Sequence, residues 1–170
     1  LVSKYLIKTN ITPIVKYITW FGSATCLIII SLLSFILKNK KISMCILSNL
    51  VIITILNQLF KFIFERPRPT EYRIITETGY SFPSGHSMVS MAFYGFIIYL
   101  IYKKVNNKYI KWLVISILSL LIVSIGISRI YLGVHYTSDV LAGFLISISY
   151  LIIYIKYTKK IIDKDSNYEK

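Results

Sequence analysis

Five apolar runs, each long enough to cross a bilayer as a helix, constrain this 170-residue chain more than any other feature. A hydrocarbon core about 30 Å thick needs roughly 20 apolar residues in a helix. None of the runs alternates polar and apolar residues as a membrane strand does. The runs cover Ile14–Leu37, Ile42–Phe64, Ser84–Tyr102, Tyr109–Ile127 and Ser138–Tyr157. The sequence therefore predicts an all-α, polytopic membrane helix bundle with five spans in this chain.

The composition supports a membrane protein. Hydrophobic residues make up 55% of the chain and charged residues only 16%, against about 25% charged residues in an ordinary soluble domain. The 20 Lys and Arg residues exceed the 7 Asp and Glu residues and leave a net charge of +13. In so apolar a chain this excess indicates a bilayer as the partner, and not a nucleic acid. Cys26 and Cys45 are too few for a disulfide framework and are interpreted as packing residues.

The basic residues indicate which way the spans run. Twelve of the 20 lie in or beside the connections that alternating spans place on one side of the membrane, and the positive-inside rule assigns that side to the cytoplasm. These twelve are Lys38, Lys40, Lys41, Lys103, Lys104, Lys108, Lys111, Lys156, Lys159, Lys160, Lys164 and Lys170. The outer face then receives residues 65–83 and 128–137, and both of these links carry arginines that topology alone does not explain.

Four polar clusters meet on that outer face because successive spans run in opposite directions. They lie at the end of the second span, the start of the third, the end of the fourth and the start of the fifth. Taken singly, each has an ordinary explanation: a snorkelling lysine with a basic loop rim, a capped helix start, or a polar link. Their shared location favours one site instead. Its members are Lys61, Arg68, Ser84, Gly85, His86, Arg129, His135 and Asp139.

The residue types in this set suit the transfer of a phosphoryl group. Three cations beside a helix N-terminus can enclose a multiply charged oxyanion, to which arginine offers paired donors. His135 is the candidate nucleophile, and Asp139, four residues later, can fix its tautomer. His86 is the candidate acid for the leaving oxygen and the candidate base for water. Because the chain has no cluster of carboxylates suited to magnesium, we expect neither a metal nor a cofactor.

Three motifs formed by these residues resemble those of the type 2 phosphatidic acid phosphatase family, a membrane group related to vanadium haloperoxidases. The first is Lys, six residues, Arg-Pro, here Lys61 to Pro69, and the second is Pro-Ser-Gly-His, here Pro83 to His86. The third is Ser-Arg, five residues, His, three residues, Asp, here Ser128 to Asp139. The resemblance implies that phosphate is held by Lys61, Arg68, Ser84, Gly85 and Arg129, with His135 as nucleophile, His86 as acid and Asp139 as the partner of His135. It also implies no metal requirement.

The same resemblance implies a membrane lipid phosphatase whose partners are a phosphorylated lipid and the bilayer, with an extracytoplasmic active site. The segments around Ser81–Val89 and Gly126–Gly143 are similar to small bacterial phosphatases that act on phosphatidylglycerophosphate or undecaprenyl diphosphate. Phosphatidic acid is a further candidate substrate, and the oligomeric state is left open. A lipid phosphotransferase using the same phosphohistidine and a non-enzymatic anion transporter stay as alternatives. The five apolar spans disfavour a vanadate-dependent haloperoxidase.

The three motifs predict one functional unit. Residues 1–170 are interpreted as a single integral-membrane phosphatase domain whose motifs occupy residues 61–69, 83–86 and 128–139. Two further arginines, Arg66 and Arg73, lie outside the motif spacing, and we expect both to tolerate lysine.

The N-terminal segment conflicts with the charge pattern of the other links. Lys4, Lys8 and Lys16 stand at the end assigned to the outside, although lysines before a first span normally stay inside. We therefore expect the full protein to have an upstream span, which makes six. Residues Tyr5–Ile7 are then expected to form an amphipathic connector at the outer interface.

Overall fold

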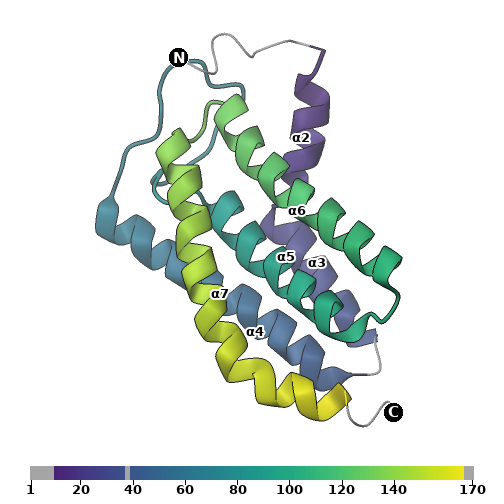
Figure 1. Cartoon of the computed structure of the whole chain (residues 1–170). Coiled ribbons are helices and arrows are strands. Elements are labelled where there is room, and N and C mark those ends of the chain that lie inside the picture. Colours follow the sequence, from purple (N-terminus) through teal and green to yellow (C-terminus); the bar gives the residue numbers. More distant parts are fainter. Residues whose placement is uncertain (1–9, 37–38, 167–170) are drawn as a thin grey trace.

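The computed structural model describes residues 10–36 and 39–166, and within these ranges every regular element is a helix (Figure 1). In chain order the elements are α2 (Thr12–Trp20), α3 (Ala24–Leu33), the short 3-10 helix η1 (Ser34–Ile36), α4 (Lys40–Phe64), α5 (Gly85–Lys104), α6 (Lys108–Tyr131) and α7 (Thr137–Ser166). The predicted all-α class is confirmed. The expected connector at Tyr5–Ile7 lies outside the described residues, as do Lys4, Lys8, Lys38 and Lys170.

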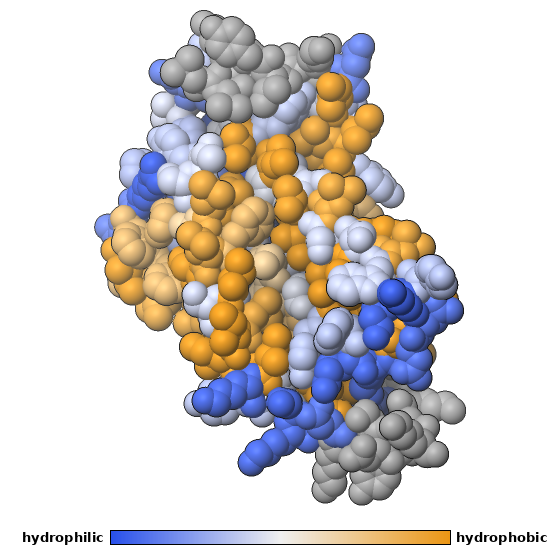
Figure 2. Space-filling view, viewed as in Figure 1, coloured by the Kyte–Doolittle hydropathy of each residue, from blue (hydrophilic) through white to orange (hydrophobic). Residues whose placement is uncertain are grey.

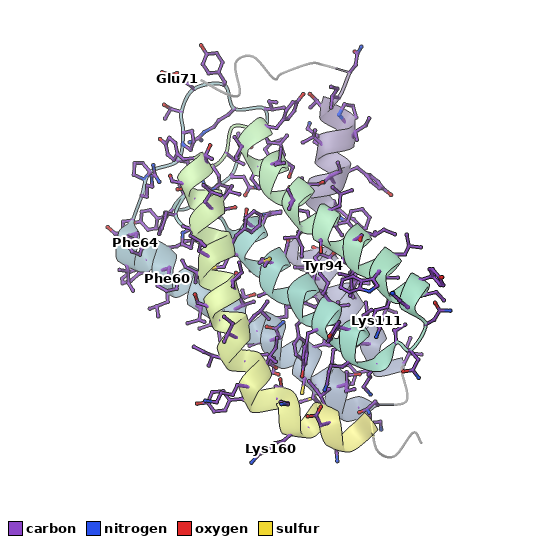
Figure 3. The ribbon with its side chains drawn as sticks, viewed as in Figure 1. Phe60, Phe64, Glu71, Tyr94, Lys111 and Lys160 are labelled. Atoms are coloured by element: carbon purple, nitrogen blue, oxygen red, sulfur yellow. The ribbon has the colours of Figure 1, made fainter. Side chains whose placement is uncertain are left out.

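Helices α4, α5, α6 and α7 are each long and apolar enough to cross a bilayer, and α2 with α3 makes a fifth candidate if the bent pair counts as one span. An apolar band covers the middle of the visible face, and hydrophilic residues gather below it (Figure 2). Lys111 and Lys160 lie at this lower end, whereas Glu71 lies at the opposite end (Figure 3). The helices therefore alternate in direction, as the charge pattern predicts.

The first apolar run is broken, and the expectation of one continuous helix over Ile14–Leu37 is wrong. Helices α2 and α3 meet at a 45° bend across residues 21–23. Ser23 caps the start of α3 with its side chain, and the hydroxyl of Tyr94 donates to the carbonyl of Phe21 at 2.8 Å. These bonds satisfy backbone groups that the break releases, which makes a bend tolerable inside an apolar bundle.

Helix α5 lies at the centre of the bundle, where it packs against α4, α6 and α7 (Figure 1). Phe93 and Phe96 on α5 are completely buried. Helix α6 has the opposite character, because large apolar side chains such as Leu113 and Leu120 are exposed along it. A helix that is apolar on its outer face as well is typical of a bundle surrounded by lipid.

Helix α7 continues to Ser166, well beyond the end expected at Tyr157. Ile162 in the extension is only 1% exposed and belongs to the core. Nζ of Lys103 at the end of α5 also lies 3.1 Å from Oδ1 of Asp163. These tertiary contacts stabilise the polar end of α7, whose composition alone would not predict a helix.

The two outer links are joined to each other. Helix α4 ends at Glu65, whose φ of 43° turns the chain out of the helix. Further along that link, the N–H of Ile74 donates to the carbonyl of Leu132 at 3.1 Å. Gly133, in the second link, packs against the backbone of the first link. Its φ is 71°, and a Cβ at this position would lie 2.3 Å from the carbonyl oxygen of Tyr72. Position 133 therefore requires glycine both for its positive φ and for its close approach to the neighbouring backbone.

This requirement generates a stability prediction. Gly133→Ala should lower the thermal unfolding midpoint in detergent, because the new Cβ meets backbone that cannot easily move and a left-handed conformation costs roughly 1–2 kcal/mol for a residue with a side chain. Gly79 is the matched control, since it has the same φ of 71° but open space around its Cα. Gly79→Ala should therefore shift the midpoint much less, and equal shifts would contradict the packing described for Gly133.

Candidate active site

Most of the predicted site residues line one cavity of about 960 Å³. The cavity opens beside the end of α4 and reaches the start of α5, the end of α6 and both outer links. Topology alone predicts this convergence, because these helix ends share one face of the bundle. The lining includes Lys61, Arg68, Gly85, His86, Arg129 and His135.

The two remaining predicted residues lie behind the cavity wall. Ser84 is completely buried and caps α5, with Oγ accepting from the N–H of Ser87 at 3.4 Å and from its hydroxyl at 2.9 Å. Ser84 is the N-cap of α5, as expected for a capped start of the third span. Asp139 is also completely buried, in the first turn of α7. Both residues therefore build the site from within the protein.

Arg129 brings a guanidinium into the interior of the bundle, where it is only 1% exposed. Nη1 donates to Oγ1 of Thr19 at 2.9 Å, and Nη2 pairs with Oε1 of Glu77 at 2.5 Å. No acceptor among the described residues reaches Nε. A buried donor without a partner is costly, and this one belongs to a residue that lines the cavity. Nε of Arg129 is therefore available to an anion.

The other two cations are held by backbone carbonyls of the link between α4 and α5. Arg68 donates from Nε to Gly79 at 2.9 Å and from Nη2 to Thr78 at 3.0 Å. Nζ of Lys61 donates to the carbonyl of Tyr80. Carbonyl dipoles fix both side chains without neutralising their charge, so the cavity keeps a positive potential.

The start of α5 adds to the positive potential of the three basic side chains. Gly85 and His86, its first two residues, line the cavity, and a helix N-terminus favours a negative charge. Asn57 packs behind this turn, with Oδ1 only 3.1 Å from where a Cβ of residue 85 would lie. The bend of the first span packs against the same turn: a Cβ at Gly22 would lie 3.2 Å from Cδ2 of His86.

The ring of His135 is oriented from both sides. Nε2 lies 3.2 Å from Nη1 of Arg68. Because a guanidinium can only donate, Nε2 accepts and the proton of the neutral ring is assigned to Nδ1. Nδ1 in turn lies 3.5 Å from Oδ2 of Asp139 and 3.4 Å from Oγ of Ser81. The predicted contact between His135 and Asp139 is confirmed, and the lone pair of Nε2 points toward Arg68.

Burial lowers the pKa of His135 to about 4. The hydrogen bond to Asp139 opposes this shift, whereas the charge of Arg68 reinforces it. The imidazole is therefore neutral at neutral pH and keeps a lone pair for bonding, as a nucleophile requires.

Sequence reasoning missed three residues that touch this machinery. Oγ of Ser81 donates to Oδ2 of Asp139 at 2.5 Å, Nη1 of Arg66 donates to Oδ1 of the same carboxylate at 2.7 Å, and Glu77 pairs with Arg129. All three come from the irregular link between α4 and α5. The available signals were weak: Ser81 lies just ahead of the Pro-Ser-Gly-His motif, and Arg66 shares the Arg-Pro-Arg-Pro run with Arg68.

The donor set of the cavity suits an oxyanion better than a cation. Three basic side chains and a helix N-terminus surround it, and the carboxylate of Asp139 already accepts several protein donors. In the part of the chain that the structure describes, no three His, Cys, Asp or Glu side chains group closely enough to hold a metal ion.

Fold and site together define a helical membrane protein with a His–Asp pair beside a cavity lined by basic side chains. A family model described as the PAP2 superfamily matches residues 42–163, which run from α4 through most of α7. The chain belongs to the PAP2 superfamily.

Two curated relatives share substantial sequence with the chain. Phosphatidylglycerophosphatase B of Bacillus subtilis is 38% identical over 109 residues, which cover 63% of this chain and 53% of the relative. Undecaprenyl-diphosphatase of Sulfolobus acidocaldarius is 30% identical over 130 residues, which cover 71% of this chain and 58% of the relative. The chain thus spans little more than half the length of these relatives.

Two crystal structures share the fold. The transmembrane PAP2 type phosphatidylglycerolphosphate phosphatase from Bacillus subtilis superposes with a TM-score of 0.86 and 28% identity, covering 94% of this chain and 82% of that one. LpxE from Aquifex aeolicus gives a TM-score of 0.74 and 25% identity, covering 92% of each chain. These similarities confirm the predicted membrane helix bundle.

The unpartnered buried donor of Arg129 generates a binding prediction. In detergent, inorganic phosphate should raise the thermal unfolding midpoint, and Arg129→Lys should weaken phosphate binding by about 10- to 100-fold. This range corresponds to the ~1.5–3 kcal/mol of a hydrogen bond to a charged group, because lysine cannot replace the planar fork. Arg73→Lys is the control, since Arg73 bonds only its own link at Pro69 among the contacts described. Equal weakening in both variants would indicate general surface charge.

Proposed function

We propose that this chain is a membrane lipid phosphatase that hydrolyses a phosphomonoester or a diphosphate of a lipid through a phosphohistidine on His135. The position of Nε2 of His135 carries the proposal: it lies 3.2 Å from Arg68 inside a cation-lined cavity, while Asp139 holds the opposite side of the ring. Relatives named as phosphatases for phosphatidylglycerophosphate and for undecaprenyl diphosphate support the same class of reaction.

The reaction needs two displacements at phosphorus. In the first, the lone pair of Nε2 of His135 forms a bond to phosphorus while the bond to the leaving oxygen breaks, and protonated His86 gives that oxygen its proton. In the second, His86 takes a proton from water, whose oxygen attacks phosphorus as the N–P bond breaks. Inorganic phosphate leaves, and both histidines return to their starting states.

The cations supply the electrostatic part of catalysis. Arg68 and Arg129 are placed to bond the phosphoryl oxygens, and Lys61 adds a third charge at the rim of the cavity. Such donors act most strongly where charge is concentrated in the transition state, and in a site largely shielded from water. Asp139 stabilises the charge that His135 acquires during attack.

The cavity shape supports a lipid as the substrate. From the cationic end it continues between α3 and α4, along an apolar wall. This wall includes Leu27, Ile28, Leu50, Val51 and Ile55. An acyl or prenyl chain in this groove would stay beside the bilayer core while its phosphate enters the cationic end.

Phosphate release by the purified full chain tests the function. The panel should include undecaprenyl diphosphate, phosphatidylglycerophosphate and phosphatidic acid, each with and without excess EDTA. We expect release from at least one lipid and no effect of EDTA. No release from any lipid, or activity restored only by magnesium, would contradict the proposal. An added alcohol tests the phosphotransferase alternative, because transfer would yield a phosphorylated alcohol in place of free phosphate.

The nucleophile assignment generates its own prediction. His135→Ala should lower turnover by more than about 100-fold, because the covalent route is lost together with its proton-transfer steps. When the reaction is started with a labelled lipid phosphate and quenched rapidly without acid, a phosphoenzyme should be trapped in the wild type and none in this variant. His86→Ala should still form the phosphoenzyme from a substrate with a good leaving group, since acid assistance then matters little. A phosphoenzyme in His135→Ala would refute the assignment.

The outer location of the site is a further part of the proposal. Lys111 and Lys160 lie at the end of the bundle opposite Glu71 (Figure 3), and the positive-inside rule puts that lysine-rich end in the cytoplasm. A cysteine at Glu71 should react with an impermeant reagent added to intact cells, and one at Lys160 should not. Native Cys26 and Cys45 are buried and give a low background. The reverse pattern would move the site to the cytoplasmic side.

A further inference from the structure

Arg66 occupies a fixed position beside the proposed catalytic pair. It follows Glu65, the residue that turns the chain out of α4, and precedes Pro67, whose ring fixes one backbone angle. Its carbonyl accepts the N–H of Ser81 at 2.8 Å, which joins the two ends of the link between α4 and α5. The backbone of Arg66 is therefore held before its side chain makes any contact.

The guanidinium of Arg66 reaches across to α7. Nη1 donates to Oδ1 of Asp139 at 2.7 Å and to Oγ of Ser138 at 2.8 Å. The charged group lies 4.2 Å above the ring of Tyr136. The Arg66 side chain is 36% exposed while that of Asp139 is fully buried, so Arg66 shields the carboxylate from solvent.

The two carboxylate oxygens of Asp139 accept from different donors. Oδ2 accepts from Oγ of Ser81 at 2.5 Å and from the N–H of Tyr136 at 3.0 Å, and it is the oxygen that faces Nδ1 of His135. Oδ1 is the oxygen held by Arg66. Any rotation of the carboxylate that breaks the contact with Arg66 also moves Oδ2 away from His135.

We propose that Arg66 is a positioning residue that sets the orientation and charge of Asp139, and through it the tautomer of His135. The proposal rests on the function proposed above. Arg66 is not among the residues that line the cavity, so it acts through Asp139 and not on the substrate. This replaces the sequence-based expectation that Arg66, like Arg73, tolerates lysine.

The physical consequence concerns the proton on the imidazole. With Oδ2 in place, the proton stays on Nδ1 and Nε2 keeps its lone pair toward Arg68. Without Arg66, the buried carboxylate of Asp139 loses its charged partner at Oδ1, which is costly for a buried ion, and its orientation then depends on Ser81 and the N–H of Tyr136 alone. With Oδ2 held less firmly, a larger fraction of the rings leaves the arrangement in which Nδ1 faces Asp139 and Nε2 accepts from Arg68, and those rings cannot attack phosphorus. The loss appears in kcat, since the phosphate-binding cations are unchanged.

Steady-state kinetics of the full chain with its best lipid substrate test the proposal. Arg66→Gln should lower kcat by about 10- to 100-fold, the usual effect of removing a partner that orients a functional histidine, with KM changed by less than about two-fold. Arg66→Lys, which keeps the charge but not the planar fork, should lie between Arg66→Gln and the wild type. Arg73→Gln is the matched control on the same link and should keep wild-type kcat.

The pH profile separates positioning from a general loss of folded protein. His135 is faced by Asp139 and Ser81 at Nδ1 and by Arg68 at Nε2, with Arg129, Lys61 and His86 nearby. Arg66 places a further positive charge on the far side of Asp139, so removing that charge makes protonation of His135 more favourable. The acid limb of the kcat/KM profile should therefore move to higher pH in Arg66→Gln. Loss of folded protein alone would lower kcat/KM by the same factor at every pH and leave the pH of the acid limb unchanged.

A second variant covers the case in which Arg66→Gln does not fold. Tyr136→Leu removes the exposed ring below the guanidinium, and kcat should fall about two- to five-fold, the equivalent of the ~0.5–1 kcal/mol of an exposed cation–π contact. Wild-type kcat and an unmoved acid limb in Arg66→Gln would overturn the proposal, as would wild-type kcat in Tyr136→Leu if only that variant folds. If the wild type released no phosphate from any lipid, the proposed function itself would fail.

Discussion

The buried carboxylate of Asp139 joins the two outer links on which the site is built. It lies in the first turn of α7, where the helix dipole favours a negative charge. A carboxylate without solvent needs charged or hydrogen-bonding partners, and this one has Arg66 and Ser81 from the first link and the backbone of Tyr136 from the second. Its main-chain carbonyl also accepts the N–H of Ser84 at 3.1 Å. One residue thereby positions His135 and the start of α5 relative to each other.

The site places three like charges at one end of an apolar bundle, which is unfavourable until an anion arrives. Glu77 compensates part of the charge of Arg129, and backbone carbonyls hold Arg68 and Lys61 without neutralising them. A bound phosphate therefore relieves repulsion and supplies acceptors at the same time. The same cavity continues from its cationic end along the apolar wall between α3 and α4.

The sequence by itself was sufficient for the helix class and for most of the site. Apolar runs of about 20 residues leave few alternatives to membrane helices, and alternation of the spans then brings the ends of four helices to one face. Local rules also held: Ser84 caps α5, Gly133 adopts a positive φ, and the four-residue spacing brings His135 to Asp139. Each of these features depends on neighbours a few residues away, so periodicity and spacing are enough to reveal it.

Only the tertiary structure decided the features that depend on distant partners. The bend after Trp20 lies in a continuous apolar run, and a hydroxyl from Tyr94 on another helix satisfies its released carbonyl. The extension of α7 is stabilised by burial of Ile162 in the core and by a salt bridge between Asp163 and Lys103 on α5. Arg66 meets Asp139 across 73 residues of sequence because an irregular link returns toward α7. Hydrophobic periodicity carries no information about the path of such a link, so its contacts with the site became visible only in three dimensions.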